Sequence, residues 1–297
     1  MQVIPKDKVI FHFNQTNPCV YTVQDGETFW VETDDCYSGQ ISSAKVLRPQ
    51  IDISIMDASV GPIAVAGASP GDVLCVEILD IQFAPQGVMV TSPGLGVLGK
   101  KITQPNTKII PIRDGVAHFS PEIELPLTPM VGVLGVAPKE GDIHCAVPGD
   151  HGANMDTKMV KKGAKVFLPV AVEGAGLAVG DLHACMGDGE LSGTGIETAG
   201  KVLLKTTVIK QDFTRRPVIE TDEGIYILAS HEDIHEAVLV AVDEAAGFLM
   251  NKKSLDFPDA YRLVSATCDI QISQLVNDRL TVRIRIPKVD LGINSVV

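Results

Sequence analysis

The stretch VPGDHGANMDTKMVKKGAKVFLPVAVEGAGLAVGDLHACMGDGELSGTGIE, from Val147 to Glu197, alternates short apolar segments with glycine-rich turns. Short apolar segments bounded by glycines are typical of β-strands and their connections. The stretch is also dense in side chains that can bind metals or move protons. They are Asp150, His151, Asp156, Asp181, His183, Asp188, Glu190 and Glu197. Such a density on glycine-rich backbone predicts a built functional site.

Strand geometry divides part of this stretch into two pairs of side chains. On an extended strand, residues two positions apart point to the same side. We therefore expect Asp181 and His183 to share one face, and Asp188 and Glu190 to share another. Gly-Asp and Asp-Gly pairs are also ordinary turn chemistry, so a purely structural role for some of these acids stays open.

The number of acids nevertheless favours a functional cluster. A carboxylate costs several kcal/mol to bury unless it is paired or bound to a metal. An imidazole together with several carboxylates suits a divalent cation with mixed nitrogen and oxygen ligands, such as zinc. The sequence therefore indicates a metal site or an acid–base cluster.

The N-terminal half of the chain is also β-like. Alternating runs such as Val9–Phe13 and Thr28–Glu32, and the longer apolar run Val73–Leu79, are separated by glycine and proline turn signals. Many short strands with such turns predict a β-sandwich or barrel. The glycine-rich segment Gln86–Gly99 predicts a long loop that could lie over a site.

The C-terminal part has a different character. A strand is expected over Lys201–Lys210, and Ser230 begins a predicted helix with Asp233 three residues on in a capping-box-like start. A second helix is expected over Pro258–Ala266, with proline in its first turn. Further strands are expected over residues 268–272 and 280–286.

Together these patterns predict a mainly β fold in two parts. The first is a β-sandwich or barrel body over residues 1–215, which carries the acid-rich stretch. The second is a smaller α+β part over residues 216–297, packed on the body. At 297 residues the chain is long enough to bury a sizeable core.

Bulk composition excludes several classes of partner. The net charge of -12 argues against nucleic acid, because no basic patch would neutralise phosphates, and it disfavours an anionic membrane surface. No apolar run is long enough for a membrane span, and the N-terminus does not read as a secretory signal. The six cysteines form no C-x-x-C pair. We therefore expect a cytoplasmic protein with free thiols and a small neutral substrate.

Three rival motifs are weaker than the acid-rich stretch. The segment His231–His235 matches the zinc-protease pattern H-E-x-x-H, but it falls at the start of the predicted helix. The segment Gly94–Gly99 matches G-x-G-x-x-G without the strand and helix that dinucleotide binding requires. No G-x-S-x-G elbow is present. A pair of His183 with Cys185 stays open, although a buried structural thiol is the better interpretation of Cys185.

The chain resembles the acetamidase/formamidase family over nearly its whole length. The matching segments are HGANMD (His151–Asp156), GDLHA (Gly180–Ala184), GDGE (Gly187–Glu190), GTGIE (Gly193–Glu197), ETDDCYSGQ (Glu32–Gln40) and GASPGD (Gly67–Asp72). The resemblance implies hydrolysis of a small aliphatic amide to its carboxylate and ammonia. It also implies a jelly-roll-like β fold and a homo-oligomer, and it makes a divalent metal at the active site plausible.

These considerations lead to a hypothesis for the site. The metal ligands would be Asp35, Asp156 and His183, with His151 as a further candidate. Glu190 would act as the general base, and Asp188 or Glu197 would orient the ligands. Asn154 and backbone N–H groups would stabilise the oxyanion. The alternatives are a non-enzymatic β-sandwich module that binds a metal or small ligand, and a related metal-dependent lactamase.

Overall fold

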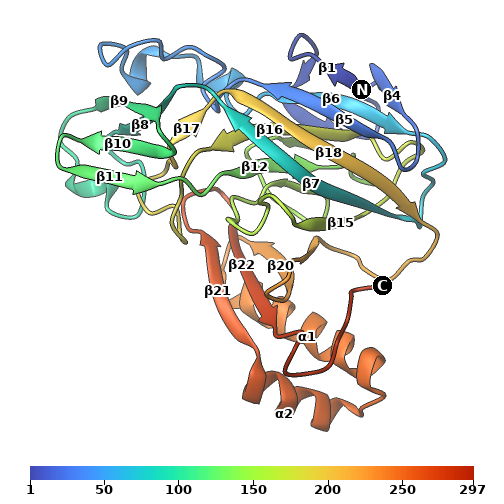
Figure 1. The fold of residues 1–297 in the computed structure, drawn as a ribbon. Coiled ribbons are helices and arrows are strands. Elements are labelled where there is room, and N and C mark those ends of the chain that lie inside the picture. Colours follow the sequence, from blue (N-terminus) through green and yellow to red (C-terminus); the bar gives the residue numbers. More distant parts are fainter.

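The computed structural model describes residues 1–297, and most of the regular structure is β-strand, in two large sheets (Figure 1). The first sheet has nine strands. In spatial order they are β1 (Gln2–Ile4), β5 (Thr28–Thr33), β18 (Gly200–Ile209), β7 (Val73–Phe83), β15 (Lys165–Pro169), β19 (Val218–Glu220), β20 (Ile225–His231), β22 (Leu280–Ile286) and β21 (Asp269–Gln274).

The second sheet has 11 strands and carries the acid-rich stretch. Its main path is β11 (Ile123–Pro126), β10 (Val116–Ser120), β9 (Asn106–Arg113), β8 (Gln86–Thr91), β17 (Glu197–Thr198), β16 (Leu177–His183), β12 (Met130–Gly135) and β14 (Gly152–Asn154). A branch from β16 adds β6 (Ser59–Val65), β2 (Val9–Ile10) and β4 (Tyr21–Val23). A separate ribbon pairs β3 (His12–Asn14) with β13 (Asp142–His144).

The two large sheets enclose the main core. A cluster of 31 buried residues draws on strands of both, for example Val76 of β7 and Val166 of β15 in the first sheet and Val179 of β16 in the second. Every residue of β12 and β16 is buried, which explains why β12 reads as an apolar run rather than as an alternating one. The predicted mainly β sandwich-like architecture is confirmed.

The C-terminal strands extend the first sheet and carry both helices, α1 (Ile234–Lys253) and α2 (Phe257–Thr267) (Figure 1). Ala237, Ala241 and Ala245 recur every four residues along α1, so one face of the helix packs closely on β20 and β22. Hydrogen bonding continues from β15 to β19 across residue 215. The boundary between residues 1–215 and 216–297 therefore remains a proposal. Neither helix is both long and apolar enough to cross a membrane.

The predicted start of the first helix is wrong by one turn. Ser230 and His231 are the last residues of β20, and the helix is capped by Asp233, whose side chain accepts a hydrogen bond from the His235 backbone N–H. Asp233 can cap because its own backbone is extended. His231 and His235 consequently share no helix face, which removes the geometric basis of the H-E-x-x-H alternative.

Two further predictions in the N-terminal half need correction. Val9–Phe13 is not one strand, because β2 pairs with β6 whereas β3 pairs with β13. The segment Gln86–Gly99 is a loop only in its second part. Its first six residues form β8, where Gly87 lets Ile196 pack directly against the backbone: a Cβ at position 87 would lie 2.4 Å from the Ile196 side chain.

Candidate active site

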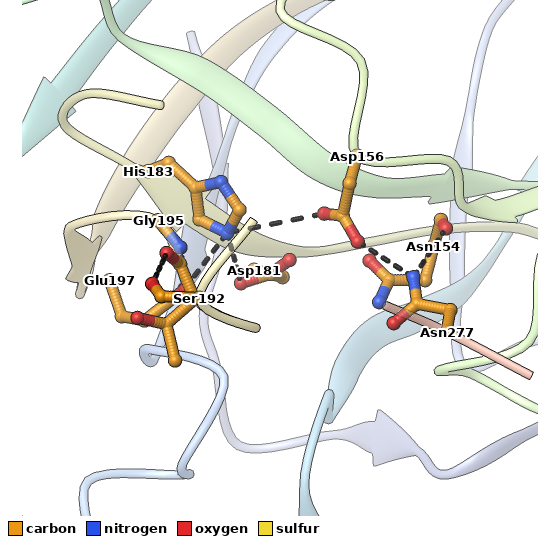
Figure 2. Close-up of polar contacts among 9 residues, drawn as sticks. Asn154, Asp156, Asp181, His183, Ser192, Gly195, Glu197 and Asn277 are labelled. Atoms are coloured by element: carbon orange, nitrogen blue, oxygen red, sulfur yellow. Dashed lines mark hydrogen bonds and ion pairs between the residues drawn. The ribbon is translucent and has the colours of Figure 1, made fainter. Parts of the chain in front are cut away.

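Buried acids surround His183 at the end of β16 (Figure 2). Asp181 lies two positions earlier on the same strand. Glu197 begins β17, which pairs with β16 so that Glu197 is opposite His183. Asp156 follows β14, on the other side of β12. Neighbouring strands of one sheet thus bring together residues that the sequence spreads over 42 positions.

Three carboxylates converge on one nitrogen of the His183 ring. Nε2 lies 2.9 Å from Oε2 of Glu197, 3.2 Å from Oδ1 of Asp181 and 4.0 Å from Oδ1 of Asp156 (Figure 2). A ring nitrogen carries at most one hydrogen, so it serves one of these oxygens at a time. His183 and the three acids are each at most 2% exposed, so water cannot solvate the two carboxylates that Nε2 does not serve. The site therefore concentrates acidic groups in the interior.

Hydrogen bonds fix the far oxygens of two of these acids. Asn277, in the loop after β21, donates from Nδ2 to Oδ2 of Asp156 at 2.9 Å (Figure 2). The backbone N–H of Gly195 donates to Oε1 of Glu197 at 2.8 Å. In both acids one oxygen is held and the other faces His183. The chain thereby directs the free oxygens toward a common point.

Glycine at position 132 is required by this packing. A Cβ there would lie 2.0 Å from Oδ2 of Asp181 and 2.7 Å from Oδ1 of Asp156. Three of the acids also adopt left-handed backbone, with φ of 40° at Asp156, 55° at Asp181 and 46° at Glu190. Such conformations cost on the order of 1 kcal/mol or more each and are concentrated at functional sites.

The acids line a cavity of about 370 Å³. Asp156, Asp181, Glu190 and Glu197 are all part of its wall, and Asn154 contributes as well. The remaining wall includes apolar side chains from distant segments. They are Ile53, Met56, Leu95 and Val276. A small organic molecule can therefore reach the carboxylates.

Burial shifts the protonation equilibria of this cluster. Burial and the neighbouring Asp181 raise the pKa of Asp156 to about 7, and burial raises the pKa of Glu197 to about 8 despite the nearby His183. Burial and the charge of Asp156 hold the pKa of Glu190 well above its ordinary value. Burial lowers the pKa of His183, but the charges of Asp181 and Glu197 outweigh it and raise that pKa well above 6.5. Without a cation, the cluster retains protons at neutral pH.

The residues present fit a divalent cation. Asp156, His183 and Glu190 each offer one ligand atom within 4.8 Å of the others, and so do Cys36, Asp181 and Glu197. The hydrogen bond of His183 Nε2 goes to Oδ1 of Asp181, so a cation at this point would serve two buried oxygens without a hydrogen-bond partner, Oδ1 of Asp156 and Oε2 of Glu197. It would also offset the repulsion that raises the carboxylate pKa values.

Several predicted site residues lie together. Asp156, His183, Glu190 and Glu197 form the cluster, and Asp181 faces His183 as the strand alternation predicted. Asn154 lines the same cavity. Asp35 is buried nearby, and its Oδ1 accepts a hydrogen bond from the Gly39 backbone N–H at 2.9 Å, but it belongs to neither ligand group. Its role as a ligand remains a prediction.

Two predicted residues lie elsewhere. Asp188 binds Arg283, with 2.8 Å from Nη2 to each carboxylate oxygen. The prediction that Asp188 and Glu190 share a strand face is wrong, because the segment is a turn in which Gly189 and Glu190 have positive φ. His151 packs edge-on against Phe13 and lines a different cavity.

Sequence reasoning missed three residues of the site. Cys36 directly follows Asp35 and is part of the second ligand group. Asp57 lines the cavity and is 7% exposed, with a pKa raised well above its ordinary value by burial and by Asp181. Asn277 lies 121 positions from Asp156, its partner. Only Cys36 had a local signal, because it lies within a segment that carries the family resemblance.

One known protein family matches most of this chain. The sequence profile of the Acetamidase/Formamidase family matches residues 6–143 and 142–288. The chain belongs to this family. The resemblance seen in the sequence motifs is thus confirmed over nearly the whole chain.

Solved members of the family share the fold. An acetamidase from Bacillus halodurans is 40% identical, with a TM-score of 0.96 over 98% of both chains. A predicted acetamidase/formamidase from Thermoanaerobacter tengcongensis is 43% identical, with a TM-score of 0.96 over 99% of both chains. A Schizosaccharomyces pombe protein with a formamidase name is 28% identical over 256 residues. That alignment covers 65% of this chain and 62% of the yeast protein, less than two thirds of its length.

Proposed function

We propose that this chain hydrolyses a small aliphatic amide, of the acetamide or formamide type, to a carboxylate and ammonia. The observation that carries the proposal is the convergence of three buried carboxylates on Nε2 of His183 beside a cavity. Family membership supplies the substrate class, because acetamidase and formamidase names recur among the relatives.

Asp156 and His183 of the first ligand group, and Cys36, Asp181 and Glu197 of the second, would hold a divalent cation. A cation held there would polarise the amide carbonyl and would lower the pKa of a water molecule toward about 7. The Gly195 N–H fixes one oxygen of Glu197, which leaves the other oxygen directed toward the same point as Nε2 of His183.

Glu190 is the general base of the proposed reaction. Its carboxylate lines the cavity and lies close to Asp156 and His183. It takes a proton from the water that attacks the amide carbon and delivers that proton to the leaving nitrogen as the C–N bond breaks. The products are the carboxylic acid and ammonia.

Asn154 is positioned to stabilise the developing negative charge. It lies in the cavity wall beside the acids, where its side-chain amide can donate to the carbonyl oxygen of a bound amide. Backbone N–H groups of the glycine-rich turns are further donors. The acids would otherwise repel an oxyanion, so such donors are needed on the substrate side of the cavity.

A substrate panel tests the proposal. Purified protein is assayed for ammonia release from formamide, acetamide and butyramide, before and after chelation and re-addition of zinc. We expect turnover that chelation abolishes and zinc restores. Opening of a γ-lactam ring without ammonia release would favour the lactamase alternative. A protein that binds zinc and hydrolyses none of these compounds would be a binding module, and the proposal would fail.

Three finer points belong to the same proposal. Zinc is the expected metal, because an imidazole, carboxylates and the Cys36 thiol form a mixed ligand set; elemental analysis of the purified protein tests this. A homo-oligomer is expected from the family resemblance, and light scattering tests it. Cytoplasmic localisation is expected from the six free thiols, and cell fractionation tests it.

A further inference from the structure

The guanidinium of Arg283 is buried near the active site, yet the proposed reaction does not use it. Arg283 lies on β22, is 0% exposed and leads the fully buried side chains by volume. Arginine is almost never fully buried without partners. Its charge is balanced by Asp188, both of whose oxygens accept from Nη2 at 2.8 Å.

The other donors of Arg283 fix the guanidinium within the C-terminal hairpin formed by β21 and β22. Nε donates to Oε1 of Gln271 at 2.9 Å. Nη1 donates to the backbone oxygen of Ile272 and to Oγ of Ser273, each at 3.3 Å. Five hydrogen bonds therefore hold one rigid group whose free edge faces Asp188.

Asp188 belongs to the turn Gly187–Glu190, which also bonds to the hairpin through its backbone. The N–H of Gly189 donates to the Ser273 oxygen at 2.9 Å, and the Leu275 N–H donates to the Gly189 oxygen at 3.1 Å. The next residue, Glu190, has left-handed backbone and directs its carboxylate to the cavity. The position of that carboxylate thus depends on where the hairpin holds the turn.

We propose that Arg283 is a positioning residue for Glu190. By holding Asp188, it fixes the turn and keeps the Glu190 carboxylate beside Asp156 and His183. The inference rests on the proposed function, in which Glu190 is the base. Proton transfer requires near hydrogen-bond distances, and a displacement of about 1 Å can cost about 10²-fold in rate.

The test compares Arg283→Lys with Arg285→Lys. Lysine at 283 keeps the charge but cannot reproduce the five hydrogen bonds. Arg285 lies two residues along the same strand and pairs with the exposed Asp269 at 3.2 Å, so it is the matched control. For Arg283→Lys we expect kcat of ammonia release to fall about 10- to 100-fold with KM within about twofold and unchanged metal content. Arg285→Lys should match the wild type.

A double-mutant cycle and a crystal structure separate positioning from stability. Asp188→Asn should lower kcat similarly, and Arg283→Lys with Asp188→Asn should be no worse than the more damaging single change. A lower melting temperature with unchanged kcat and pH profile would show a purely structural role and overturn the proposal.

If the wild type hydrolyses no amide, the proposed function fails, and the crystal structure of Arg283→Lys still decides positioning. A displaced Glu190 carboxylate supports it, and an unmoved one contradicts it.

Discussion

Close packing at single residues holds the active-site acids in place, most plainly at Gly132. The prediction that Asp181 and His183 share a face needed only their two-residue spacing. The requirement for glycine at position 132 could not be predicted, since the two carboxylates that crowd it lie 24 and 49 residues away along the chain. Local patterns carry no information about such distant contacts.

Gly132→Ala should disrupt the cluster without changing any acid. The added methyl group would meet Oδ2 of Asp181 at 2.0 Å, so the carboxylates must move. We expect metal content to fall and kcat/KM for acetamide to drop at least about 10²-fold. Gly247→Ala, in α1, is the control because its Cβ would meet nothing within 4 Å. It should retain activity and gain roughly 0.5–1 kcal/mol of stability. Wild-type metal content in Gly132→Ala would contradict this description.

Whole elements were predicted more reliably than their ends. The apolar stripe identified α1 and the proline identified α2, and the structure places both where they were expected within a few residues. The predicted start of α1 is too early because serine is a preferred N-cap residue, whereas Ser230 belongs to a strand. Its hydroxyl pairs with Thr281 across the sheet at 3.0 Å, which keeps Ser230 in β20. Tertiary pairing overrode the local signal.

Substitution at the observed cap tests this correction. Asp233→Ala should lower the free energy of unfolding by about 1 kcal/mol, because the His235 N–H loses its acceptor. Urea denaturation measures the change. Asp243→Ala, in the middle of the helix, should cost less, since that side chain caps nothing. Equal losses in both variants would mean that Asp233 is not the cap.

At the scale of the whole molecule, the buried acids make the metal-free protein sensitive to pH. Asp156 and Glu197 titrate near 7 and 8 in the folded protein but have ordinary values of 3.8 and 4.5. The folded state therefore keeps protons that the unfolded chain releases above about pH 4. This stabilisation is complete below that pH and is lost as the pH rises through about 8. Asp181, whose pKa is lowered, opposes the trend in part.

We accordingly expect the free energy of unfolding of chelated protein to fall by a few kcal/mol between about pH 5 and pH 8. Urea denaturation at several pH values measures this. Asp156→Asn should flatten the dependence because it removes one of the raised groups. Zinc should restore stability most strongly at high pH, since the ligands are then deprotonated. Stability of the chelated protein that rises toward pH 8 would contradict the assignment.

Part of the site could not be predicted from the sequence because its residues come from segments far apart along the chain. Motifs between His151 and Glu197 identified most of the cluster and the family. They did not reveal that the C-terminal hairpin contributes Asn277 and Arg283, because no local pattern marks these residues. Asp188 was predicted to orient the metal ligands, but it binds Arg283, 95 residues away, and does not line the acid-lined cavity.

The most direct test of the account is ammonia release from acetamide by Glu190→Gln. The variant keeps the size of the side chain and removes its basicity, so turnover should fall about 10²- to 10⁴-fold while metal content and melting temperature stay at wild-type values. Glu140→Gln, at an exposed position outside the acid-lined cavity, should be fully active. Near-normal ammonia release by a folded, metal-loaded Glu190→Gln would contradict the account.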